Sequence, residues 1–98
     1  MLITYKNKDE EGTETYLLSE NDETIGFIKI NLALQMIMDI FVKEELRKKG
    51  YGTQLVKHAE KLFVEKGILE ISTTQINNES YGFFDKLGYS LTGSKTLN

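Results

Sequence analysis

Apolar residues change their spacing halfway along the chain, and this change restricts the folds open to it. In the first half, residues 13–19, 24–30 and 36–42 form runs typical of strands, and four polar residues at 20–23 fit a hairpin turn. The run at 36–42 is apolar at every position except Asp39, which predicts a strand covered on both faces. The first half therefore indicates a sheet that carries helices.

The spacing then becomes helical. Five apolar residues recur on one face of a predicted amphipathic helix, which ends at the stop signal Gly67. They are Leu55, Val56, Ala59, Leu62 and Phe63. A strand run follows at 68–76, so the segment from 36 to 76 predicts a right-handed parallel crossover of strand, helix and strand.

A second, shorter helix is predicted after residue 78. Its apolar residues at a spacing of three are Tyr81, Phe84 and Leu87. Asn77 or Asn78 is available as its N-cap, and Gly88 ends it.

Short elements complete the chain. Weak alternation predicts an edge strand at 2–5, a polar loop follows at 6–12, and residues 89–92 form a last strand. The predicted order is β-β-β-β-α-β-α-β, an α+β fold with an α/β-like crossover. The length of 98 residues fits one domain over residues 1–98.

The residue census excludes several kinds of site. The chain has no cysteine and one histidine, so disulfides, thiolate metal sites and two-histidine metal sites are excluded, and no metal is expected. That histidine, His58, lies between Lys57 and Ala59 in the helical pattern, and we interpret it as a surface residue.

No apolar run reaches the roughly 18–20 residues that a membrane span needs. The first residues lack the basic and then apolar layout of a secretory signal. We therefore expect a cytoplasmic protein without a membrane partner.

Charge is distributed unevenly. Residues 1–45 hold ten Asp and Glu against four Lys, whereas residues 46–98 hold eight Lys and Arg against five acids. The net charge of −3 argues against nonspecific nucleic-acid binding, and the basic second half suits a small polyanion.

A glycine-containing turn lies between the strand at 36–42 and its helix. It consists of Arg47, Lys48, Lys49, Gly50, Tyr51, Gly52 and Thr53. Glycines let a backbone approach a ligand, and a helix N-terminus presents free N–H groups and a positive dipole end to an anion. The turn is thus a candidate pyrophosphate cradle, although such turns also occur without an anion. It matches neither the P-loop nor the dinucleotide fingerprint.

A second cluster supplies context for this turn. Asn77, Ser80, the pair Phe83-Phe84 and the pair Gly88-Tyr89 follow Val42, Arg47, Gly50 and Gly52 at defined spacings. With these residues, the stretch from Met36 to Gly93 resembles the GNAT superfamily of acetyl-CoA-dependent N-acetyltransferases. The resemblance implies a mixed, mostly antiparallel sheet with two helices.

The resemblance also implies how acetyl-CoA would bind, in the opening between the strands at 36–42 and 68–76. Main-chain groups of Ile40, Phe41 and Val42 would pair with the pantetheine arm. Backbone N–H groups from Arg47 through Lys48, Lys49, Gly50, Tyr51 and Gly52 would hold the pyrophosphate, and Thr53 would add a hydroxyl. Asn77 would hydrogen-bond the pantetheine or lie beside the thioester, and Phe84 would lie next to the cofactor.

The same resemblance implies direct attack of an amine on the acetyl thioester in a ternary complex. Where many members have a tyrosine that protonates the departing thiolate, this chain has Phe84, which cannot donate a proton. Tyr81, one turn earlier, is the alternative acid, unless it belongs to the core or water delivers the proton.

Asp39 is the candidate general base. A carboxyl group in an apolar strand is expected to have a raised pKa. Asp39 could instead face open solvent in the cleft or pair with a lysine.

Family members usually carry two helices between the first strand and the hairpin, and the loop at 6–12 has room for neither. The acceptor site is then open, which favours a protein lysine or N-terminus over an enclosed metabolite. Alternatively, a second subunit of a homodimer supplies the missing wall and covers edge strands. The acidic first half favours a cationic amine.

Two functions follow. The first is acetyl transfer to an amine. The alternative is a non-catalytic module that binds CoA or another protein, which Phe84 and the missing helices favour.

Overall fold

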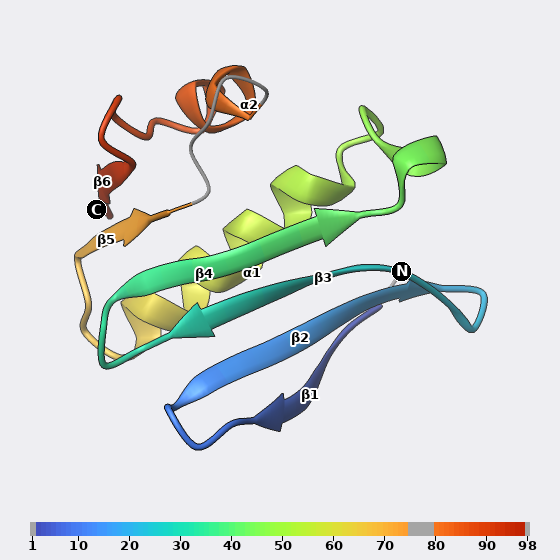
Figure 1. Ribbon diagram of the computed structural model, residues 1–98, viewed down its shortest axis with the longest axis horizontal. Helices are drawn as coiled ribbons and strands as arrows, with labels where there is room; N and C mark the ends of the chain where they lie inside the picture. Colours follow the sequence, from blue (N-terminus) through green and yellow to red (C-terminus); the bar gives the residue numbers. More distant parts are fainter. Residues whose placement is uncertain (1, 75–79, 98) are drawn as a thin grey trace.

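A computed structural model describes residues 2–74 and 80–97, and it has the expected order of strands and helices (Figure 1). The α+β class is therefore confirmed. The elements are β1 (Leu2–Lys8), β2 (Thr13–Glu20), β3 (Glu23–Asn31), β4 (Met36–Val42), the 3-10 turn η1 (Glu44–Leu46), α1 (Tyr51–Glu65), β5 (Glu70–Thr73), α2 (Tyr81–Lys86) and β6 (Ser94–Thr96).

The six strands form one sheet in chain order, and only β4 and β5 are parallel. The parallel crossover through α1 is thus confirmed. Within the described residues the pairing of β5 with β4 is confined to the start of β4, at Met36–Ser72 and Ile37–Thr73. β5 ends at Thr73, and among the described residues the far end of β4 pairs with β3 alone.

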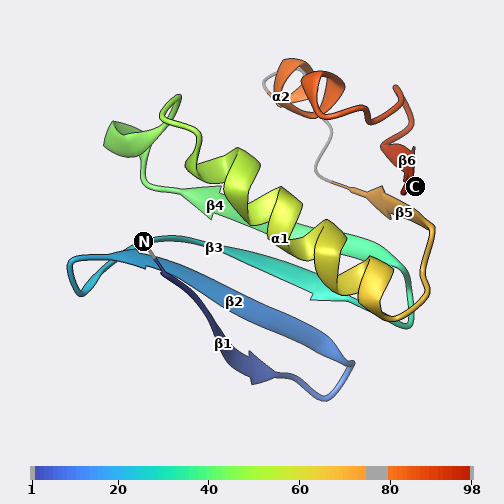
Figure 2. The same cartoon turned by 180° about the vertical axis from the view of Figure 1, so that it is seen from behind.

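The core lies between one face of the sheet and α1, which lies behind β3 and β4 in Figure 1 and in front of them in Figure 2. Both layers contribute side chains that are almost completely buried. From the strands come Leu18, Ile28, Ile30 and Ile37, and from α1 come Leu55, Val56, Ala59 and Phe63. The helical pattern thus marks the face of α1 that packs on the sheet.

The expectation that β4 is covered on both faces is wrong. In Figure 1 no described helix lies in front of β1 to β4. On that face the rings of Phe27 and Phe41 stack with their centroids 5.6 Å apart, and Phe41 is 42% exposed. The apolar run therefore includes an aromatic pair that is partly open to solvent, in addition to buried core residues.

The first strand is longer than predicted. β1 continues to Lys8 because pairing with β2 resumes at Asn7–Thr15, beyond an irregularity after Tyr5. A tight turn at residues 9–12 then leads directly into β2 without a helix. Polar side chains on an exposed edge strand masked this strand in the sequence.

The hairpin between β2 and β3 is confirmed. Its two loop residues, Asn21 and Asp22, have φ values of 53° and 65°, as the type I′ turn requires.

The last strand does not lie at 89–92, where it was predicted. Tyr89 is only 3% exposed and packs on Phe84, and residues 90–93 form a turn in which the Gly93 N–H donates to the Ser90 carbonyl oxygen at 2.9 Å. The strand is β6 instead, which pairs with β5. β5 itself is shorter than the predicted 68–76, of which Gln75 and Ile76 lie outside the described residues.

Both helix ends fall at the predicted glycines. Gly67 and Gly88 have φ values of 77° and 92°. The following N–H groups, of Ile68 and Tyr89, donate to the carbonyl oxygens of Phe63 and Phe84 at 2.9 and 3.0 Å. This is the Schellman pattern, for which the left-handed glycine is the usual terminator.

None of the helices in the described part of the chain is long and apolar enough to cross a membrane.

His58 is not the surface residue that the helical pattern predicted. Its ring is half-buried and meets the ring of Tyr16 on β2 edge-on, with the centroids 5.3 Å apart. Burial lowers the pKa of His58 below its ordinary value of 6.5, and the charge of Lys61 adds to this effect while that of Glu65 opposes it.

The lowered pKa of His58 predicts a pH-dependent stability. Because the unfolded chain binds the proton more tightly, this contribution is complete above pH 6.5 and falls as the pH drops toward the folded-state pKa. Urea unfolding between pH 7 and 5 should therefore show a steeper loss of stability in the native chain than in His58→Gln. Equal slopes in the two proteins would contradict this role of His58.

Candidate acetyl-CoA site

A cleft of about 930 Å³ opens where the end of β4, the turn before α1 and helix α2 meet. Its β4 wall consists of Ile40, Phe41 and Val42, the three residues predicted to pair with the pantetheine arm. Within the described residues β5 does not pair with this end of β4. The edge of β4 that points away from β3 therefore faces the cleft.

The close approach of β3 to this wall depends on Gly26. A Cβ atom on Gly26 would overlap the carbonyl oxygen of Phe41 and come within 3.1 Å of the Val42 Cα. Next to this point the Lys43 N–H donates to the Ile25 carbonyl oxygen at 2.9 Å. The position of the β4 wall therefore requires a residue without a side chain on the neighbouring strand.

The second wall is the glycine-containing turn and the first turn of α1. It consists of Leu46, Arg47, Lys48, Gly50, Gly52 and Thr53. Lys48 and Gly50 adopt left-handed φ values of 64° and 88°, and a Cβ on Gly50 would meet no atom within 4 Å. The turn thus leaves open space in front of its backbone.

This turn directs the N-terminus of α1 at the cleft. The Gln54 N–H makes the first i→i−4 bond of α1, to the Gly50 carbonyl oxygen at 3.1 Å. The N–H groups of Tyr51, Gly52 and Thr53 precede it, and in a helix these positions have no intrahelical acceptor. Together with the dipole of a 15-residue helix, they suit a phosphate.

Arg47 lines the cleft, but its backbone N–H and its guanidinium also make contacts within the protein. Its N–H donates to the Glu44 carbonyl oxygen at 3.3 Å, and its Nε donates to the Val42 carbonyl oxygen at 2.9 Å. Its guanidinium also lies over the Phe41 ring, at 5.9 Å from the centroid. Arg47 thus ties the turn to the end of β4.

Two other predicted residues of the turn do not line the cleft. Lys49 is exposed elsewhere on the turn. The Tyr51 hydroxyl donates to Glu20 Oε2 at 2.8 Å, and this hydrogen bond raises the pKa of Tyr51. Neither side chain therefore lines the cleft, and backbone groups are what these two residues could offer it.

Helix α2 forms the third wall through Ser80, Gly82, Phe83, Phe84 and Lys86. Of these, only Phe84 was a predicted site residue. Phe84 is completely buried, and its ring meets those of Phe83 and Tyr89. The spacing of Ser80, Phe83 and Phe84 on one helical face was the available signal for this wall. Asn77 lies outside the described residues.

The structure does not bring the two predicted catalytic residues into this cleft. Asp39 Oδ1 accepts the N–H of Ile40 at 2.9 Å, and its cross-strand neighbour Lys29 has its ammonium over the Phe27 ring. The Tyr81 hydroxyl makes a weak contact of 3.5 Å with Asp85 Oδ1. Neither residue is among those that line the cleft.

The walls differ in chemistry along the cleft. Arg47, Lys48 and Lys86 supply positive charge, and none of the described residues that line it is acidic. Side chains of β4 and α2 supply apolar surface. A ligand with phosphates at one end and a long, weakly polar arm fits this arrangement, and acetyl-CoA is such a ligand. Among residues 2–74 and 80–97 no group of three or more acids and histidines could hold a metal ion.

The sequence matches the model of the acetyltransferase (GNAT) family over residues 2–89. Fold, cleft and family match agree, and the chain belongs to this family. The resemblance seen in the sequence is thereby confirmed.

Three proteins illustrate the similarity. An uncharacterized N-acetyltransferase from Chlorobaculum tepidum is 38% identical over 65 residues, covering 66% of this chain and 39% of its own. The peptidyl-lysine N-acetyltransferase YjaB from Escherichia coli is 30% identical over 81 residues, covering 83% and 52%. The structure of the PaiA N-acetyltransferase of Thermoplasma acidophilum with coenzyme A has a TM-score of 0.74 at 23% identity, over 86% and 60%. The chain thus spans about 40–50% of the length of these two sequence relatives.

Proposed function

We propose that this protein transfers the acetyl group of acetyl-CoA to an amine. The observation that carries this proposal is a cleft in which the β4 edge at Ile40 to Val42, free of pairing with the described part of β5, meets the N-terminus of α1 and three cations. Within it, Ile40 to Val42 would hold the pantetheine arm, and the backbone from Lys48 to Thr53 would hold the pyrophosphate.

Acetyl-CoA supplies an activated acetyl group as a thioester. The neutral amine nitrogen bonds to the carbonyl carbon and gives up one proton, the carbon–sulfur bond breaks, and CoA leaves as a thiolate that takes up a proton. Asp39 and Tyr81 remain our candidates for moving these protons, with Asn77 beside the thioester.

The acceptor we propose is the side-chain amine of a lysine in a protein. The name of the related YjaB protein, a peptidyl-lysine N-acetyltransferase, supports this class. The direct turn from β1 into β2 also supports it, because no helix there encloses an acceptor. In the alternative arrangement, a second subunit of a homodimer supplies the missing wall of the acceptor site. Light scattering at micromolar concentration distinguishes the open monomer from the homodimer.

The alternative of a non-catalytic module is favoured by two observations. Phe84 occupies the position where many relatives have a proton donor, and neither Asp39 nor Tyr81 lines the cleft. Mass-detected acetyl transfer to a panel of lysine peptides and small amines decides between the two functions. Turnover that requires both acetyl-CoA and a lysine peptide supports the enzyme, and binding without any turnover supports the module.

The Phe84→Tyr variant should increase kcat by at least about tenfold, because a phenol in the cleft can protonate the leaving thiolate. The KM for acetyl-CoA should change less than kcat, because the added hydroxyl acts on the leaving thiolate and not on the pantetheine arm or the phosphates. Phe27→Tyr is the control, because it adds the same hydroxyl at a strand residue that does not line the cleft, and it should not raise kcat. A kcat of Phe84→Tyr equal to that of the native chain would contradict a proton-transfer limit at this position.

A further inference from the structure

Helix α2 and the N-terminus of α1 touch at one glycine. A Cβ atom on Gly52 would lie 3.2 Å from both Cε1 and Cζ of Phe83, and 4.0 Å from a methyl of Val42. Distances of 3.2 Å are tighter than ordinary van der Waals contact, so the Phe83 ring occupies the space that a side chain at this position would need. The second glycine of the turn therefore has a role in packing besides any role toward phosphate.

We propose that the docking of Phe83 on Gly52 fixes α2 relative to the N-terminus of α1, and thereby sets the width of the cofactor cleft. Phe83 is then a positioning residue. The relation to acetyl-CoA rests on the function proposed above, whereas the position of α2 does not.

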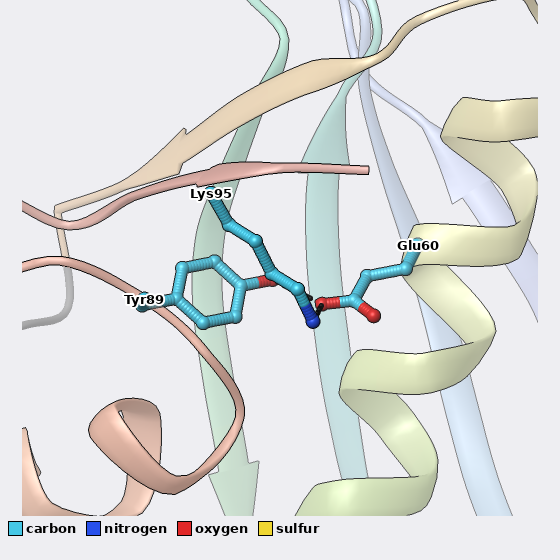
Figure 3. A network of polar contacts seen from close by, with 3 residues as sticks. All are labelled: Glu60, Tyr89 and Lys95. Carbon is cyan, nitrogen blue, oxygen red and sulfur yellow. Dashed lines mark hydrogen bonds and ion pairs between the residues drawn. The ribbon is translucent and has the colours of Figure 1, made fainter. Parts of the chain in front are cut away.

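A second contact anchors the chain that follows α2 to the middle of α1 (Figure 3). Glu60 Oε2 accepts hydrogen bonds from the Tyr89 hydroxyl at 2.7 Å and from Lys95 Nζ at 3.0 Å, and the Lys95 ammonium lies over the Tyr89 ring. The side chains of Glu60 and Lys95 are only 16% and 24% exposed. Such a shielded network holds its partners better than an exposed ion pair does.

The two contacts lie eight residues apart on α1, a little over two turns, and so face directions about 80° apart around the helix. One holds α2 at the mouth of the cleft, and the other holds the chain after α2 farther along. Pairing between β4 and β5 is confined, in the described residues, to Met36–Ser72 and Ile37–Thr73. The spacing between α2 and the β4 wall is thus determined largely through α1, and at the cleft through Phe83.

The test is a double-mutant cycle of Gly52→Ala and Phe83→Leu. Because the chain has no cysteine, Lys57→Cys and Asp85→Cys allow spin labels on the exposed sides of α1 and α2. We expect each single variant to shift the distance between the labels and to weaken acetyl-CoA binding about fivefold to tenfold. In the double variant the added methyl group fits beside the smaller side chain, so distance and affinity should return toward native values, with a coupling of about fivefold or more.

Leu62→Ala on α1 is the control for simple destabilisation, because Leu62 packs on the core and does not line the cleft. It should lower the melting temperature without changing the distance or the affinity. Independent effects of the two substitutions on the distance, or no effect of Phe83→Leu on it, would overturn the proposal. If the label distances in the cycle are coupled but the native chain does not bind acetyl-CoA, the result would contradict the proposed function and leave the position of α2 as proposed.

Discussion

Replacing Gly52 by tryptophan should weaken acetyl-CoA binding by about 100-fold or more. An indole at this position would extend into the space between the first turn of α1 and α2, where Phe83 already lies within 3.2 Å of a Cβ atom. The side chain would displace Phe83 or fill the cleft in front of the helix N-terminus. Either result removes contacts on which the proposed cofactor site depends.

Calorimetric titration of acetyl-CoA measures this effect. Lys57→Trp places the same side chain on the exposed face of the same helix and should bind like the native chain. Circular dichroism of Gly52→Trp should show that the secondary structure is retained. Native-like affinity in a folded Gly52→Trp protein would show that acetyl-CoA binds elsewhere.

Gly26→Ala should lower the free energy of unfolding by about 3 kcal/mol. A methyl group there would overlap the Phe41 carbonyl oxygen, and this neighbour is backbone that cannot rotate away. The end of β4 would have to move from β3, which would also disturb the cleft wall that Phe41 and Val42 form. Urea unfolding of the two proteins gives the difference.

Gly82→Ala is the matched control. A Cβ on Gly82 meets no atom within 4 Å, and Gly82 lies in α2, where alanine is favoured over glycine by about 1 kcal/mol. This variant should be as stable as the native chain or slightly more stable. A Gly26→Ala protein whose unfolding midpoint lies at the same urea concentration as that of the native chain would contradict the close contact between β3 and β4.

Much of the fold could be predicted because local patterns and tertiary structure agree. The apolar spacing from Leu55 to Phe63 identified the buried face of α1, and Gly67 and Gly88 identified the helix ends. The turn from Arg47 to Thr53 was placed correctly at the start of α1, since glycines and free N–H groups belong together there. These features depend on neighbours in the sequence.

The errors concern contacts between segments that are distant in the sequence. The sequence predicts a strand at 89–92, but the Tyr89 ring packs on Phe84 and its hydroxyl donates to Glu60 on α1. The position of His58 between Lys57 and Ala59 predicts a surface residue, but its ring meets that of Tyr16, 42 positions earlier, a contact that spacing along the chain does not indicate.

The α2 wall of the cleft shows the same limit. Lys86 and Phe83 line the cleft only because α2 folds back to the N-terminus of α1, and the packing of Phe83 on Gly52 follows from that arrangement. Spacing along the chain indicates which residues share a helical face. It does not indicate which other segment that face will meet.

The most direct test of the cofactor site is a titration of acetyl-CoA into ¹⁵N-labelled protein, followed by amide NMR. The glycine amide signals report on the cleft and on parts of the protein outside it in the same spectrum. We predict shifts for Gly50, Gly52 and Gly82, which line the cleft, and none for Gly12 and Gly67, which lie outside it. Unchanged spectra at millimolar acetyl-CoA, or shifts centred on Gly12 and Gly67, would contradict the assignment of this cleft as the acetyl-CoA site.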